Sequence, residues 1–143
     1  MKNFIQYVNN EILRQASGLY YTVSDLAPHV ETDLFNSPTL VIWSGSSDDT
    51  FFQDKHVNWA FRALHDMLHL ETRMDFNPKS EIELGRIQAN MFKGSELLQD
   101  LVYSEVSSQA EYYLRNGMFV SNQVEFTKQD LLKINSRFDK ILR

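Results

Sequence analysis

The stretch FRALHDMLHLETRMDFNPKSEIELG, residues 61–85, decides the fold class because its apolar residues recur at helical spacing. One face carries residues at the i, i+3, i+4, i+7 and i+8 spacing of a helix that packs on a core: Phe61, Leu64, His65, Leu68 and His69. The run DFNP at 75–78 interrupts this pattern, and a second helix is expected to begin at Pro78 or Ser80. The stretch therefore predicts helices near 54–73 and 79–93.

The rest of the chain extends the same pattern. Helical spacing predicts further helices at 3–16, 95–115 and 127–142, the last with a stripe of Leu131, Ile134, Phe138 and Ile141. The segment SDLAPHVETDLF (24–35) is expected to hold a short helix broken near Pro28, and TLVIW (39–43) is a short apolar run that suits a strand. We expect a mainly α, single-domain helical bundle (1–143) of about four to five helices, with at most a short strand element near 39–43.

Composition narrows the classes of function. The chain has 143 residues, no cysteine and a formal net charge of −5. Any bound metal must therefore be held by histidine and carboxylate side chains. No basic footprint for a nucleic acid is present, and no apolar run approaches the roughly 18 residues of a membrane span. The N-terminal segment is polar and amphipathic, unlike a signal peptide, so we expect a soluble, cytoplasmic protein with no nucleic-acid or membrane partner.

Two of the four histidines lie on the core-facing stripe of the helix predicted at 54–73. His65 and His69 are one turn apart, the arrangement that lets two imidazoles share one metal ion. Asp66 is rotated by about 100° from His65. Asp66 is expected to orient an imidazole, to act as a general base, or to pair with Arg62 one turn back.

The helix predicted at 95–115 also places a charge on an apolar stripe. Its face combines Leu98, Leu101, Val102, Glu105, Gln109 and Tyr112. A carboxylate among apolar residues is costly unless it is paired or binds a cation. We therefore predict that Glu105 converges with His65 and His69 as a third metal ligand, and that Gln109, one turn from Glu105, faces the same place.

Glu81 has two interpretations. The run SEIE at 80–83 fits a capping box in which Ser80 caps the helix and Glu83 reaches back. Alternatively Asn77 caps the helix and Pro78 is its first residue. In both cases Glu81 lies near the first turn, where a carboxylate complements the helix dipole. Glu81 is also a candidate general base or a further metal ligand.

Two segments resemble a widespread group of uncharacterised bacteriophage proteins. That group has a helix of the form FRAxHDxxH, followed by an aromatic residue, a glutamate and a later EVxxQAEY segment; related segments occur in large multidomain phage proteins. The matching positions lie within 57–126 and are Phe61, Arg62, His65, Asp66, His69, Phe76, Glu81, Glu105, Gln109, Glu111 and Tyr112. The resemblance implies a phage origin, hence the host cytoplasm, and a recurring His/Glu constellation without an assigned reaction. It adds Glu111, which together with Gln109 is expected to contact a bound cofactor.

The first functional hypothesis is a metal-dependent hydrolase or lyase acting on a small molecule. His65, His69 and Glu105 would hold one divalent ion (Zn, Fe or Mn), with Asp66 or Glu81 as the catalytic base. Two histidines and one carboxylate leave positions open for water, which the ion acidifies. The zincin signature HExxH has a glutamate where this chain has the shorter Asp66, which argues against a peptidase.

Two alternatives remain open. An HD-type phosphohydrolase would use His29, His65, Asp66 and Asp100. A non-enzymatic phage protein would instead bind a host protein or serve in the virion, with a dimer as one option. Its His/Glu cluster would be a structural polar network that fixes helix register.

Overall fold

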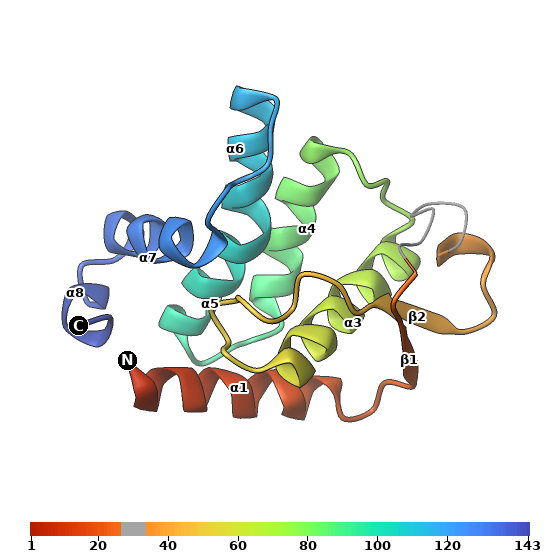
Figure 1. Ribbon diagram of the computed structural model, residues 1–143, viewed down its shortest axis with the longest axis horizontal. Coiled ribbons are helices and arrows are strands. Elements are labelled where there is room, and N and C mark those ends of the chain that lie inside the picture. Colours follow the sequence, from red (N-terminus) through yellow and green to blue (C-terminus); the bar gives the residue numbers. More distant parts are fainter. Residues whose placement is uncertain (27–33) are drawn as a thin grey trace. The chain divides into compact units, whose positions relative to one another are not determined.

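The computed structural model describes residues 1–26 and 34–143, and it confirms the predicted mainly α class (Figure 1). The helix expected near Pro28 falls largely within residues 27–33, outside the described residues. The elements in chain order are α1 (Lys2–Ala16), β1 (Tyr21–Ser24), β2 (Leu40–Trp43), α3 (Lys55–Thr72), α4 (Pro78–Asn90), α5 (Glu96–Tyr103), the π-helical segment η1 (Ser104–Ser108), α6 (Gln109–Asn116), α7 (Gln123–Ile134) and α8 (Phe138–Ile141).

The chain divides into two compact units. The N-terminal unit is Ile5–Phe76, and the C-terminal unit combines Asn77–Arg143 with Met1–Phe4. Each unit is described by itself, and the expectation of a single domain stays a prediction.

In the N-terminal unit, a small parallel sheet packs against α3. β1 pairs with β2 in a register that runs from Tyr21 opposite Leu40 to Ser24 opposite Trp43. The strand predicted at 39–43 is confirmed. β1 was not predicted because its sequence, YTVS, lacks the continuous apolar run of β2. The core beside the sheet is formed by Leu34, Leu40, Ile42 and Ala63, with Leu19, Tyr21, Trp59, Leu70 and Phe76 packed against it.

The boundaries of α3 follow from its caps. Asp54 accepts hydrogen bonds from the backbone N–H groups of His56 and Val57, which satisfies two donors of the first turn. At the other end Arg73 adopts the left-handed conformation, with φ 60°, and its N–H donates to the carbonyl of His69 at 2.8 Å. The observed helix agrees with the prediction of 54–73 to within one residue at each end.

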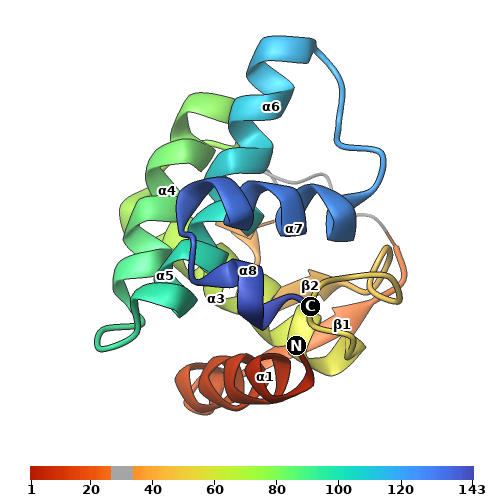
Figure 2. The ribbon, with the colours of Figure 1, turned by 90° about the vertical axis from the view of Figure 1, so that its left-hand side faces the viewer.

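In the C-terminal unit, α4 runs alongside α5, η1 and α6 (Figures 1 and 2). Asn77 is the cap of α4, since its side chain accepts from the N–H of Ser80 at 2.9 Å and Pro78 is the first helical residue. The alternative cap at Ser80 was therefore wrong. The helix ends at Asn90, three residues before the predicted end.

The helix predicted at 95–115 is present but not regular. It begins after Ser95, whose side chain caps α5, and it ends at Gly117 with φ 69°. Between these ends η1 widens the helix by π-type turns. Such an insertion shifts which side chains share a face, and it frequently marks a functional site.

The prediction of one final helix at 127–142 was wrong in its bounds. α7 begins at Gln123 and ends at Ile134, and Asn135 has extended backbone angles (φ −149°, ψ 116°) before the short α8 (Figure 2). The side chain of Asn135 donates to Asp100 at 3.1 Å and accepts from the N–H of Arg137 at 3.1 Å. These hydrogen bonds compete with the helical ladder and interrupt the helix.

A glycine sets how closely α4 and η1 approach. A Cβ at Gly85 would lie 2.8 Å from the backbone nitrogen of Ser107 and would also clash with its Oγ. That hydroxyl donates to the carbonyl of Ile82 at 2.6 Å, so it is already held in place. Small residues at this crossing therefore allow the two backbones to pack together.

We expect Gly85→Ala to lower the free energy of unfolding by about 1–3 kcal/mol, because overpacking against backbone outweighs the better helix propensity of alanine. Urea unfolding measures the change. Gly18→Ala is the control, since a Cβ at Gly18 meets nothing within 4 Å. Equal or greater stability of Gly85→Ala would show that the contact between α4 and η1 is not tight.

Candidate metal centre

His65 and His69 lie one turn apart on α3, and their side chains meet. The two Nε2 atoms are 3.1 Å apart, and the rings are nearly perpendicular, with centroids separated by 4.7 Å. His69 is fully buried, whereas His65 is partly exposed. The i, i+4 spacing thus brings two metal-donor atoms to one point.

The backbone fixes the tautomer of His69. Its Nδ1 lies 2.8 Å from the carbonyl oxygen of Met74, which can only accept. Nδ1 must therefore donate this hydrogen bond, and in the neutral ring the lone pair is on Nε2, the atom that faces His65. A histidine that ligates a metal commonly has its other ring nitrogen held in this way.

The turn after α3 brings this carbonyl into place. The left-handed Arg73 reverses the chain, and the hydroxyl of Thr72 accepts from the N–H of Met74 at 3.3 Å. Phe76 then stacks on the imidazole of His69, with centroids 3.8 Å apart and planes at 22°. The ring of His69 is thus held at its edge by a hydrogen bond and on its face by an aromatic ring.

The separation of the two Nε2 atoms suits a shared ion. With metal–nitrogen distances of about 2.0–2.1 Å, a nitrogen separation of 3.1 Å corresponds to an angle of about 95–100° at the metal. This value lies between the roughly 90° of octahedral and the roughly 109° of tetrahedral coordination. The pair can serve either geometry with only a small adjustment.

Glu81 of the C-terminal unit could add a carboxylate to the two imidazoles. Glu81 lies in the first turn of α4 and is partly buried. His65, His69 and Glu81 form a group that could hold a metal ion. Two imidazoles and one carboxylate suit Zn, Fe and Mn.

Asp66 follows His65 on α3, and its charge acts on Arg62. Burial lowers the pKa of the Arg62 guanidinium, and the negative charge of Asp66 opposes that shift. The guanidinium donates to the carbonyl oxygens of Trp43 and Gly45, both at 2.6 Å. Arg62 thus fastens the chain after β2 to α3. The role of Asp66 as a general base stays a prediction.

Glu105 lies on η1 in the C-terminal unit, where it contacts α7. The hydroxyl of Thr127 donates to its Oε1 at 2.7 Å. Burial raises the pKa of Glu105 from 4.5 to about 7, and the hydrogen bond from Thr127 opposes that rise. That Glu105 binds a metal ion together with His65 and His69 stays a prediction.

The raised pKa of Glu105 predicts a pH-dependent stability. The folded chain keeps this proton up to about pH 7, whereas the unfolded chain releases it near 4.5, so the free energy of unfolding falls as pH rises between these values. Glu105→Gln removes this contribution. At pH 8 we expect the variant to be more stable than the parent by up to about 2–3 kcal/mol, and near pH 4 the advantage disappears.

Urea unfolding at several pH values measures this difference. Glu125→Gln, at an exposed position of α7, is the control for the loss of one charge. If the stability difference between Glu105→Gln and the parent does not vary with pH, Glu105 ionises normally in the folded chain.

The remaining predicted residues lie in the C-terminal unit or outside the described residues. Glu111 accepts from the hydroxyl of Tyr103 at 2.9 Å, and the Nε2 of Gln109 is buried with no hydrogen-bond partner in the described part of the chain. Their cofactor contacts stay predictions. For the HD-type alternative, Asp100 accepts from Asn135, burial raises its pKa, and His29 lies outside the described residues.

Sequence reasoning missed the groups that orient His69. The carbonyl of Met74 is a backbone atom, so no residue type signals it. Phe76 was noted only as a matching aromatic position, and its stacking on His69 was not predicted. The available signal was the run DFNP, because a break in the helical pattern so soon after a buried histidine can fold the chain back over that ring.

In comparisons with known proteins, no family model, curated protein or solved structure matches the chain. The resemblance to bacteriophage proteins therefore stays a prediction. No helix in the described ranges is long and apolar enough to cross a membrane. The fold and the site together define a mainly helical protein with a candidate metal centre.

Proposed function

We propose that the chain is a divalent-metal-dependent hydrolase or lyase acting on a small molecule. His65 and His69 would bind the ion through their Nε2 atoms, and Glu81 would be the third ligand. The observation that carries the proposal is the 3.1 Å approach of the two Nε2 atoms. The Nδ1 of His69 contacts the carbonyl of Met74, so in the neutral ring the lone pair is on Nε2.

The short connection between the two elements supports Glu81 as the carboxylate. Phe76 stacks on His69, and the next residue, Asn77, already caps α4. Glu81 is the fourth residue of that helix, so its Cα lies within about 12 Å of the Cα of Phe76. This short connection permits the carboxylate of Glu81 to reach the histidines.

The donor set favours catalysis over a purely structural ion. Structural zinc sites have four protein ligands, whereas catalytic sites have three and keep a position for water or substrate. A divalent ion in such a centre lowers the pKa of its water toward neutrality and polarises a substrate oxygen. Asp66, next to His65 on α3, is the proposed general base.

Cobalt substitution tests for the open position. We expect Co²⁺ added to the untagged, metal-free protein to give an absorption spectrum in the visible range that changes when azide is added, because azide enters the open position. An azide-insensitive spectrum would contradict the catalytic assignment and leave a closed, structural ion. His65→Ala is the control, since its Co²⁺ spectrum should be lost.

A non-enzymatic binding protein is the second candidate, and one observation favours it. The end of α6 and the chain after it expose a cluster of apolar side chains: Phe119 is 81% exposed, Met118 60% and Leu114 53%. Large exposed apolar side chains in one place are typical of interaction surfaces. Stable association with a host protein, undisturbed when His65 and His69 are replaced, would favour this candidate.

A further inference from the structure

A pocket lies between α4 and α5, which pack side by side in the C-terminal unit (Figures 1 and 2). Its volume is about 340 Å³, within the range of about 300–1,000 Å³ that is usual for small-molecule sites. Three residues of each helix line it: Arg86, Ala89, Asn90, Gln99, Asp100 and Tyr103. The pocket therefore belongs to one unit and shares no residue with the proposed metal centre.

Helical spacing brings these side chains to the pocket. Arg86, Ala89 and Asn90 are three and four residues apart on α4, so they lie on one face of that helix. Gln99 and Tyr103 are likewise one turn apart on α5. Ala89 is buried and contributes only a methyl group, which leaves space between the longer polar side chains.

The α4 wall supplies a cation that is available to a ligand. Arg86 is exposed and takes part in none of the ion pairs of the described residues. Burial, and then a hydrogen bond to Glu111, raise the pKa of the Tyr103 hydroxyl, and a hydrogen bond with Arg86 opposes that rise. The guanidinium thus extends from α4 to a residue of α5. Its other N–H donors form a planar fork that matches a carboxylate.

The α5 wall supplies an anion. Asp100 is partly buried, and its Oδ2 accepts from the side chain of Asn135 at 3.1 Å, whereas no described residue donates to its Oδ1. Arg137 pairs with Glu96 at 2.8 Å and not with Asp100. Burial raises the pKa of Asp100, which means that its surroundings compensate the negative charge poorly. A cationic group beside this carboxylate would therefore be favourable.

Opposite charges on the two walls discriminate among ligands. A simple anion would be attracted by Arg86 and repelled by Asp100, and a simple cation would be repelled by Arg86. A neutral ligand would desolvate both charges without pairing either of them. A molecule that carries both a carboxylate and a protonated amine matches the two walls together. The side-chain amides of Asn90 and Gln99 can donate hydrogen bonds to such a molecule and accept them from it.

We propose that this pocket binds a small zwitterion of the α-amino acid class, with its carboxylate on Arg86 and its ammonium group on Asp100. Charge-assisted hydrogen bonds of this kind are about twice as strong as neutral ones, so the two charged side chains should supply most of the affinity. The proposal is independent of the proposed metal-dependent function, because neither charged residue belongs to that centre. Each of the two can fail without the other.

Amide NMR of the full, untagged, metal-free chain tests the proposal, with the common L-amino acids added singly as probes. At least one of them should cause saturable shifts at the backbone amides of the pocket residues, with a Kd below about 1 mM. Its N-acetyl derivative lacks the ammonium charge and its carboxamide lacks the carboxylate charge. Each derivative should bind at least about tenfold more weakly. No saturable shift with any amino acid, or equal binding of both derivatives, would overturn the proposal.

Two variants test the assigned contacts. Arg86→Gln and Asp100→Asn remove one charge each and should each lower the affinity for the amino acid that binds by at least about tenfold. Arg115→Gln and Asp139→Asn, at exposed positions of α6 and α8, are the matched controls and should leave the affinity unchanged. Because Asp100 also holds Asn135, circular dichroism must first show that Asp100→Asn is folded. Unchanged affinity in Arg86→Gln, a substitution at an exposed position, would overturn the proposal.

Discussion

His69→Asn is expected to lower the affinity for Zn²⁺ by at least about a hundredfold. Asparagine can still offer a donor to the carbonyl of Met74 in place of Nδ1, but it removes the Nε2 that would bind the ion. Loss of a residue that only orients a metal ligand typically lowers metal affinity by about 10- to 100-fold. Loss of the ligand itself should lower the affinity at least as much. Competition with a chromogenic chelator measures the change.

The control for this prediction is another histidine of the same helix. His56 lies in the first turn of α3, is exposed and packs edge-on to Trp59. His56→Asn should leave Zn²⁺ affinity unchanged. Because His69 is fully buried, far-ultraviolet circular dichroism must first show that His69→Asn is folded. A folded His69→Asn variant with parental affinity would exclude His69 as a ligand.

Glu81→Gln is expected to lower Zn²⁺ affinity by at least about tenfold while the fold survives. The substitution keeps the shape of the side chain and removes the charge that a divalent ion needs from its carboxylate ligand. Loss of one negative charge from the first turn of α4 should itself cost only about 0.3–1 kcal/mol of stability. Isothermal titration with Zn²⁺ gives the affinity, and urea unfolding gives the stability.

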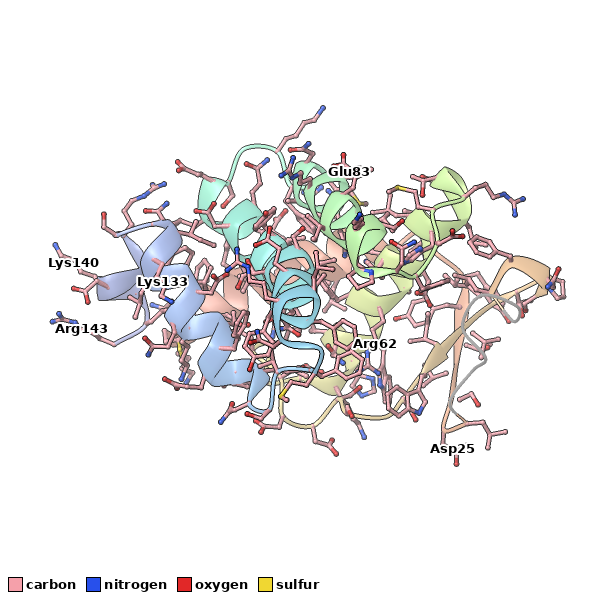
Figure 3. All side chains as sticks on the ribbon, turned by 90° about the horizontal axis from the view of Figure 1, so that it is seen from above. Asp25, Arg62, Glu83, Lys133, Lys140 and Arg143 are labelled. Atoms are coloured by element: carbon pink, nitrogen blue, oxygen red, sulfur yellow. The ribbon has the colours of Figure 1, made fainter. Side chains whose placement is uncertain are left out.

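Glu83→Gln is the matched control, two residues further along the same helix. Glu83 is exposed and projects outward from α4 (Figure 3), so its replacement should change neither quantity appreciably. Equal affinities for Glu81→Gln and the parent would remove Glu81 from the centre and make Glu105, the carboxylate first predicted as the third ligand, the next one to replace.

Most of the fold could be predicted because its helices bury regular stripes. α1 buries Ile5, Val8 and Ile12 at helical spacing, and α3 combines such a stripe with a clear cap at Asp54. The errors fall where one side chain overrides the periodic pattern. Asn135 interrupts the last helix through its own hydrogen bonds, although Leu131 and Phe138 on either side of it are both buried.

Only the part of the candidate site that lies on a single helix could be predicted from the sequence. The spacing of His65 and His69 is a property of a single helix, so it followed from the sequence. The helix face predicted for Glu105 assumed a regular α-helix from 95 to 115. Glu105 lies instead in the π-helical segment η1, where the spacing of side chains differs. The groups that orient His69 depend on a chain reversal at Arg73, which the run DFNP signals only as a helix break, and on a backbone carbonyl, which has no sequence signature.

The measurement that tests the central claim most directly is the metal content of the untagged protein after dialysis against Zn²⁺, Mn²⁺ or Fe²⁺, compared with His65→Ala. The account predicts about one firmly bound ion per chain for at least one of these metals, a higher melting temperature in its presence, and loss of both in His65→Ala. A chain that retains no ion and melts at the same temperature with and without each metal would contradict it.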